Sequence, residues 1–339
     1  MSKETTVQAS LNAGLRAALA ADERVIVLGE DVLDPYGGAF KVTRGLSAQF
    51  SDRVLATPIS EAGIVAVATG LALRGFRPIV EIMFGDFLFL AGDQIVNHAA
   101  KYRAMFNDEV RVPLVIRTPS GGRRGYGPTH SQSLEKHFLG VPGLWVVAPH
   151  SLSDPGELLR QAIFDVDDPV LFVENKIGYG EAILRGIPGY ETVRLGDTAS
   201  PFPTLWLKPH GANDGLLLCY GGMARLALDA AAALREREQL RLGLVIAAQL
   251  SPTPTSHLDA VLRAGAPSCV VTVEEAPAAG GWGAEIIATI EQIRDARRLA
   301  PISYRRVGAA NTAIPSARAL EDGILPQVQD IVAAALDCF

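Results

Sequence analysis

Glu61 is a single acid at the start of a long apolar segment, where a carboxylate is unusual. Glu61 follows a strand-like run at residues 54–57 and directly precedes AGIVAVATGLAL, a stretch without charged residues. Ser60 predicts an N-cap and Gly75 a helix end, so Glu61 lies in the first turn of a helix. An acid there ordinarily interacts with the helix dipole, an effect of about 0.3–1 kcal/mol. The apolar helix instead predicts burial, where a carboxylate is costly unless it shares a proton or hydrogen bond, as catalytic carboxylates do.

A second candidate is the glycine-rich loop predicted at residues 117–131, RTPSGGRRGYGPTHS, between the apolar runs VPLVI and LWVVA. Glycine allows positive φ and close approach of the backbone to a ligand. His130 is the one side chain in this loop that titrates near neutral pH. A mobile basic surface loop is the alternative interpretation. Its position after a strand favours a functional loop.

Two further features belong to the same half of the sequence. Glu30 ends the apolar run RVIVLG, and the carboxyl ends of parallel strands are where open α/β folds bind ligands. A solvated loop acid is the alternative for Glu30. Phe84, Phe87 and Phe89 crowd one segment, and core packing is the ordinary role of all three. A phenyl ring facing a cleft would instead stack on a flat ligand.

The elements that position these residues alternate along the chain. Apolar strands alternate with helices expected at residues 7–20, 62–73, 86–105 and 155–164, which predicts parallel strands covered on both faces. A second alternation follows a less regular stretch. We therefore expect an α/β fold of two domains, each with a mainly parallel sheet covered by helices. The expected ranges are 1–180 and 213–339, joined by a linker at 181–212.

Composition narrows the class of protein. The 339 residues carry a net charge of −6, which argues against a nucleic-acid-binding surface. No apolar run approaches the ~18 residues of a membrane span, and the polar start predicts no signal peptide. Cys219, Cys269 and Cys338 are far apart in sequence and predict neither a metal site nor a disulfide. Together these features favour a cytoplasmic protein.

Taken in order, the segments resemble the beta subunit of thiamine-diphosphate-dependent 2-oxo acid dehydrogenases, the decarboxylating component of pyruvate, branched-chain and acetoin dehydrogenases. ISEAG and THSQS at this spacing are highly specific to that family. The resemblance implies a transketolase-like pyrimidine-binding domain followed by a transketolase C-terminal-like domain. The matching segments cover nearly the whole chain and include LGEDV, GGAFKVTRGL, TPISEAGIVAVATGLAL, RPIVEIMFGDF, RTPSGGRRGYGPTHSQSLE, VPGLWVVAP, EEAPAAGGWGAEI and an IP…LED…P tail.

The resemblance also implies roles for individual residues. Glu61 matches the glutamate that activates thiamine diphosphate by hydrogen bonding to its aminopyrimidine ring. Phe87 matches the aromatic residue that stacks on the pyrimidine, and Ile59 is expected to contact the cofactor. Glu30 matches an acid near Glu61, and His130 matches the active-site histidine that handles protons during acyl transfer.

Other expectations concern ions and partners. The family holds the diphosphate through Mg²⁺ with a GDG…N motif, which this sequence lacks. The resemblance therefore implies that an alpha subunit supplies the Mg²⁺ ligands in an α2β2 heterotetramer. A monovalent-cation site, with K⁺ as its ion, is expected near Ala162, Asp165 and Asp167.

The expected reaction uses a small-molecule 2-oxo acid and transfers the acyl unit to the lipoyl group of an acyltransferase. A thiamine-diphosphate-dependent carboligase of a biosynthetic pathway is one alternative, and a non-catalytic assembly or regulatory subunit is another. The chain departs from the family pattern at His137, at Gly140 and at residues 247–250, AAQL. These departures bear on the acceptor and on subunit contacts.

Overall fold

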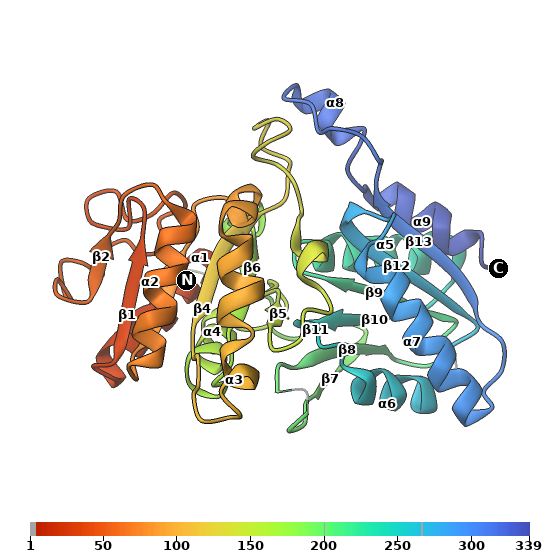
Figure 1. The fold of residues 1–339 in the computed structure, drawn as a ribbon. Helices are drawn as coiled ribbons and strands as arrows, with labels where there is room; N and C mark the ends of the chain where they lie inside the picture. The colour runs from red at the N-terminus through yellow and green to blue at the C-terminus, as the bar shows by residue number, and fades with distance from the viewer. Residues whose placement is uncertain (1–4, 200, 266) are drawn as a thin grey trace.

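The computed structural model describes residues 5–199, 201–265 and 267–339, arranged as two α/β halves that lie side by side (Figure 1). Each half is built on a mainly parallel sheet flanked by helices, which confirms the predicted fold class. Among the described residues, no helix is long and apolar enough to cross a membrane.

The first sheet has strands that are parallel throughout except at one edge. Two of its strands, Val25–Gly29 and Val115–Ser120, are completely buried. The first is an unbroken apolar run, as predicted, whereas the second also contains Arg117 and Thr118. The edge strand β11 comes from the second half and pairs antiparallel with β5, so the two halves share this sheet. The order is β11 (Gln249–Ser251), β5 (Trp145–Val147), β6 (Val170–Asn175), β4 (Val115–Ser120), β3 (Arg77–Glu81), β1 (Val25–Gly29) and β2 (Val54–Ala56).

Helices cover both faces of the first sheet. α1 (Val7–Ala21) packs against α4 (Pro155–Phe164) in one hydrophobic cluster. α2 (Glu61–Leu73) packs in another cluster, together with the segment that follows β3. The ends of these three helices lie close to the predicted ones, since hydrophobic periodicity marks them well.

The long helix expected at residues 86–105 is wrong in detail. The segment has a 3₁₀ stretch η1 (Gly85–Ala91), a π-helical stretch η2 (Gln94–Ala99) and a short α3 (Tyr102–Met105). Gly85 and Gly92 weaken a continuous α-helix. The chain therefore changes its hydrogen-bond spacing while it keeps one apolar face against the core.

The second sheet contains the segment that was expected to be a linker. Residues 181–212 include β7 (Tyr190–Leu195) and β8 (Thr204–Pro209), which pair antiparallel and join this sheet. The domain boundaries themselves stay a prediction. The remaining strands are parallel and complete the order β13 (Ser303–Ala309), β12 (Cys269–Pro277), β9 (Gly215–Tyr220), β10 (Leu242–Ala247), β8 and β7.

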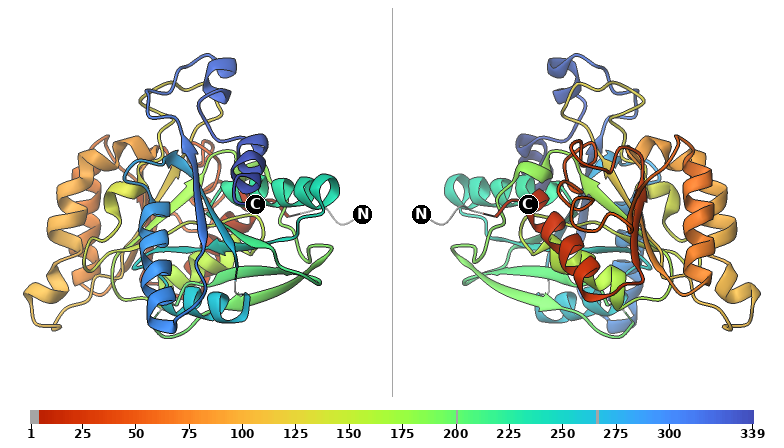
Figure 2. Two further views of the ribbon diagram at one scale, coloured as in Figure 1. Left: turned by 90° about the vertical axis from the view of Figure 1, so that its right-hand side faces the viewer. Right: turned by 90° about the vertical axis from the view of Figure 1, so that its left-hand side faces the viewer.

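Five helices accompany the second sheet within the described residues. α5 and α9 pack together and contact the strands, and α6 contacts α7. The short α8 projects away from the sheet on a long connection (Figures 1 and 2). Their bounds are α5 (Met223–Glu238), α6 (Thr255–Gly265), α7 (Trp282–Arg297), α8 (Arg318–Asp322) and α9 (Val328–Leu336).

The expectation about cysteine is wrong for two of the three residues. Cys269, at the start of β12, and Cys338, after α9, form a disulfide with a Cα–Cα distance of 5.8 Å. They are 69 residues apart, and wide separation in sequence carried no information on their proximity in the fold. Cys219 is free and buried.

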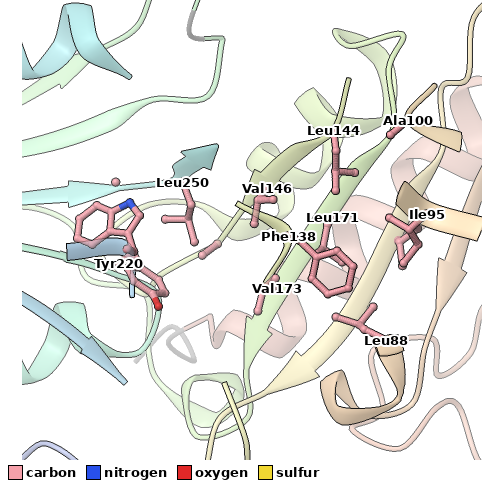
Figure 3. Packing of buried hydrophobic residues seen from close by; sticks show 14 of the residues in the cluster. Leu88, Ile95, Ala100, Phe138, Leu144, Val146, Leu171, Val173, Tyr220 and Leu250 are labelled. Atoms are coloured by element: carbon pink, nitrogen blue, oxygen red, sulfur yellow. The ribbon is translucent and has the colours of Figure 1, made fainter. Parts of the chain in front are cut away.

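The largest hydrophobic cluster joins the two halves. Figure 3 shows Leu88, Phe138 and Leu171 of the first half in a continuous layer that reaches Leu250 and Tyr220 of the second. Such a layer fixes the halves relative to each other, because separating them would expose apolar surface.

Candidate active site

Glu61 and Glu30 are buried acids without complete hydrogen bonding. Glu61 opens α2 with 6% of its surface exposed, and none of the described residues donates a hydrogen bond to its carboxylate. Ser60 occupies the predicted N-cap position, but its hydroxyl makes no capping hydrogen bond. Glu30, just after β1, has a buried Oε1 without a partner in the described structure. Burial, and then the nearby charges of Glu61 and Asp31, raise the pKa of Glu30.

His130 and Phe87 belong to a cluster of aromatic side chains. The His130 imidazole contacts the rings of Phe84 and Phe87 edge to face, at centroid distances of 4.9 and 5.3 Å. The Thr129 hydroxyl lies 3.0 Å from Nδ1 of His130. In the described part of the chain Nε2 has no hydrogen-bond partner. The structure therefore brings together the histidine and the aromatic residue singled out from the sequence.

Packing between helical segments connects Phe87 with Glu61. Phe87 belongs to η1, and η1 packs against α2, the helix that Glu61 opens. Phe87 itself is half-buried, whereas Ile59 is 83% exposed just before α2. Exposed apolar side chains continue along α2 and the segment packed on it. We call these residues the α2 face: Ile59, Val67, Leu73, Phe89 and Leu90.

The glycine-rich loop is shorter than predicted. β4 extends through Ser120, so the loop begins at Gly121. Arg117 is a core residue with 1% of its side chain exposed, and it forms ion pairs with Glu81 at 2.8 Å and Glu174 at 2.7 Å. Its basic side chain is therefore part of the sheet and not of the loop surface.

Several residues that hold the loop were not anticipated. The Lys176 ammonium donates a hydrogen bond to the carbonyl oxygen of His130. Lys176 is completely buried, and burial lowers its pKa to about 8. Glu275 accepts a hydrogen bond from the Gly122 amide at 2.6 Å, and Glu321 contacts the same loop. Two of the family-like segments contain residues of this set: EEAPAAGGWGAEI contains Glu275, and the LED of the tail contains Glu321.

The expected cation site has no clear geometry. Ala162 is buried in α4, Asp165 pairs with Arg160 at 3.2 Å, and Asp167 pairs with Arg77 at 2.8 Å. Throughout the described ranges, no group of three or more His, Cys, Asp or Glu residues is arranged to hold a metal ion. The monovalent-cation site stays a prediction.

The departures from the family pattern lie where the halves meet. The Gly140 amide donates to the Ser251 hydroxyl at 3.0 Å, which ties the segment after His137 to β11. A cavity of about 590 Å³ opens here and is lined by residues of both halves, including Lys136, Leu250 and Glu285. Gly140 thus lies at the contact between the halves, whereas His137 packs against Phe89 at a ring-centroid distance of 5.2 Å.

Comparison with known proteins covers nearly the whole chain. The family model for the transketolase pyrimidine-binding domain matches residues 3–182, and that for the transketolase C-terminal domain matches residues 206–331. Pyruvate dehydrogenase E1 component subunit beta-1, mitochondrial, from Arabidopsis thaliana is 36% identical over 334 residues, 98% of this chain and 89% of that protein. The 3-methyl-2-oxobutanoate dehydrogenase subunit beta from Mycobacterium tuberculosis is 37% identical over 318 residues, 93% of this chain and 86% of that protein.

A solved structure supports the fold. The chain described as "split gene transketolase, inactive beta4 tetramer" superposes with a TM-score of 0.72 at 20% identity. The match covers 98% of this chain and 97% of that one. At this identity the likeness establishes the arrangement of both halves.

Proposed function

We propose that this chain, which belongs to the family of beta subunits of thiamine-diphosphate-dependent 2-oxo acid dehydrogenase E1 components, acts with an alpha subunit to decarboxylate a 2-oxo acid and transfer the acyl unit to a lipoyl group. The observation that carries the proposal is the buried Glu61 carboxylate, which lacks a hydrogen-bond donor among the described residues. Because none of the described residues donates to this carboxylate, it is free to form a hydrogen bond with a ligand.

The residues fit the pyrimidine end of thiamine diphosphate. Glu61 would share a proton with the ring nitrogen, donating the hydrogen bond when the carboxyl group is protonated and accepting it when the ring nitrogen carries the proton, with Glu30 beside it as a second acid. Phe87 offers a half-buried ring for stacking on the pyrimidine, and Ile59 offers apolar contact. The cofactor, when bound, supplies an acidic thiazolium carbon and an electron sink for decarboxylation. His130 would move a proton during acyl transfer from the free Nε2 side of its ring.

The chain does not fit the other end of the cofactor. A diphosphate with Mg²⁺ needs oxygen ligands in fixed geometry, and the described residues offer no such cluster. We therefore infer that the alpha subunit provides the Mg²⁺ ligands, in an α2β2 heterotetramer, and we retain K⁺ as the ion of the expected second site. The α2 face, with Val67 59% exposed, is the surface we assign to that partner. A cytoplasmic location belongs to the same proposal.

The decisive experiment concerns Glu61. In the complex assembled with the alpha subunit, Glu61→Gln should slow hydrogen–deuterium exchange at the thiazolium carbon by about 10²–10⁴-fold, the usual contribution of a general acid–base group. Glu23→Gln, which changes an exposed acid, is the matched control. Exchange at the wild-type rate in Glu61→Gln would refute the proposed activation. Consumption of no 2-oxo acid by the wild-type complex would refute the proposed reaction.

The partner surface has its own test. Val67→Lys places a charge on the α2 face and should reduce co-purification with a tagged alpha subunit at least tenfold, since the charge would lose its water in the interface. Glu236→Lys on the exposed side of α5 is the control. Equal recovery of both variants would show that the alpha subunit binds elsewhere.

A further inference from the structure

The short helix α8 buries an acid and exposes an apolar residue. It stands beside the glycine-rich loop in each view of the molecule (Figures 1 and 2). Within α8, all of which is described, Glu321 is the one buried residue, with 0% exposed, whereas Leu320 is 63% exposed. A surface helix ordinarily has the opposite arrangement, because burying a carboxylate is costly unless it is hydrogen bonded.

Glu321 obtains its hydrogen bonds from the backbone of the glycine-rich loop. Its Oε1 accepts from the Arg123 amide and its Oε2 from the Gly125 amide, both at 2.8 Å. Bonds from backbone amides to a carboxylate are about twice as strong as neutral ones. One side chain of the second half therefore fixes two amides that are nearly 200 residues away in sequence.

The shape of the loop also depends on this contact. Gly121, Arg123, Gly125 and Gly127 all have positive φ, between 69° and 90°, so the loop has little conformational preference of its own. A Cβ on Gly122 would lie 2.7 Å from Leu325 Cδ1, and one on Gly127 would lie 2.6 Å from Ser316 Oγ. The glycines thus allow the loop to fit closely against residues 316–325.

His130 lies at the other end of the same loop. Its carbonyl oxygen is held by the Lys176 ammonium, so the segment between Gly121 and His130 is fixed at both ends. Loss of the bonds at Arg123 and Gly125 would leave the loop with two charged anchors, Glu275 at the Gly122 amide and Lys176 at the His130 carbonyl oxygen. A displacement of about 1 Å in a catalytic group can reduce a rate about 10²-fold.

We propose that Glu321 is a positioning residue for His130: through its two amide bonds it holds the glycine-rich loop so that the imidazole meets the acyl acceptor. The inference rests on the proposed function, because it assigns Glu321 a role in the step carried out by His130. It adds a contribution of the second half to an active site whose other residues in this chain come from the first half.

The test uses the complex assembled with the alpha subunit and thiamine diphosphate. Glu321→Gln removes one acceptor atom, and Asp322→Asn changes the neighbouring carboxylate of α8 as the matched control. In Glu321→Gln, amide exchange in the peptide 121–131 should accelerate at least tenfold, and acyl transfer to a lipoyl acceptor should fall 10- to 100-fold. Exchange at the thiazolium carbon, which depends on Glu61, should change less than twofold. Asp322→Asn should match the wild type in all three.

A double-mutant cycle separates positioning from simple destabilisation. In a His130→Ala background, Glu321→Gln should reduce acyl transfer by no more than twofold, because the group that it positions is gone. Equal, multiplicative losses in both backgrounds would overturn the proposal, as would wild-type amide exchange in Glu321→Gln. If Glu321→Gln does not assemble, Glu321→Asp keeps the charge on a shorter side chain, and wild-type exchange and transfer in that variant would overturn the proposal equally.

Failure of the proposed function is distinguishable from failure of this inference. Normal acyl transfer by His130→Ala would refute the role of His130, and the positioning role with it. Impaired transfer in His130→Ala together with normal transfer in Glu321→Gln would refute the positioning role alone.

Discussion

Two groups of buried acids in the first half differ in how their charges are satisfied. Glu81 and Glu174 surround Arg117, which donates to both carboxylates, and Tyr179 adds a hydrogen bond to Glu174. Glu30 and Glu61 are similarly buried, yet Glu30 Oε1 has no partner and, within the described chain, nothing donates to Glu61. The carboxylates of the first group find their hydrogen-bond donors within the chain, whereas those of the second are available to a ligand.

The sheet explains why the first group is complete. Arg117 pairs in register with Glu81 on β3, and β6, which carries Glu174, is the other neighbour of β4. Burial would lower the pKa of Arg117, but the charges of Glu174 and Glu81 outweigh it and raise this pKa. Arg117 therefore stays charged and is held by both carboxylates, which suits a structural role better than proton transfer.

The largest expected effect is on stability at Arg117. Arg117→Met should reduce the free energy of unfolding by about 3–5 kcal/mol, since it leaves two buried carboxylates without their cation. Urea denaturation followed by circular dichroism measures the change. Arg24→Met, which breaks an exposed pair with Asp22, should cost less than about 1 kcal/mol. Similar losses in the two variants would mean that the buried group is not the stabilising one.

The same comparison shows what sequence can predict. Strands such as β1 were predictable because their residues form an unbroken apolar run, and Glu61 was visible because a lone acid precedes an apolar helix. Arg117 looked like a loop residue, because its partners lie 36 and 57 residues away. Glu321 accepts a hydrogen bond from the amide of Arg123, which is 198 residues away in sequence. Local patterns mark single residues of a site, but partners that only the tertiary fold brings together leave no local pattern.

A second prediction concerns a buried group that titrates in the opposite direction from Glu30. Burial, and to a smaller extent the charge of Arg194, lower the pKa of His150 to about 4. Its contribution to stability is fully present above the unfolded pKa of about 6.5 and is lost as pH falls toward 4, at most about 3 kcal/mol. His150→Asn should therefore lose less stability than the wild type between pH 7 and pH 4.5. Exposed His210→Asn is the control, and an unchanged pH slope in His150→Asn would contradict the assignment.

The smallest effect on stability is expected at Glu30, whose Oε1 has no partner in the described structure. Burial and the charges of Glu61 and Asp31 raise the pKa of Glu30 in the folded chain. Its contribution to stability is therefore complete below the unfolded pKa of about 4.3 and is lost as pH rises through the folded value. At pH 7 the ionised Glu30 weakens the fold, so Glu30→Gln should be as stable as the wild type or more stable.

The advantage of Glu30→Gln should disappear as pH falls to about 4.3, where the wild-type acid is itself protonated. Denaturation of the wild type, Glu30→Gln and the exposed control Glu23→Gln at a series of pH values provides the measurement. In the complex with the alpha subunit, the same variant should slow exchange at the thiazolium carbon by about tenfold, because Glu61 loses its neighbouring acid. If Glu30 serves to bind a ligand, Glu30→Gln should keep its stability while the complex loses part of its activity. Loss of stability at pH 7 would instead place Glu30 with Glu81 and Glu174 as a structural acid.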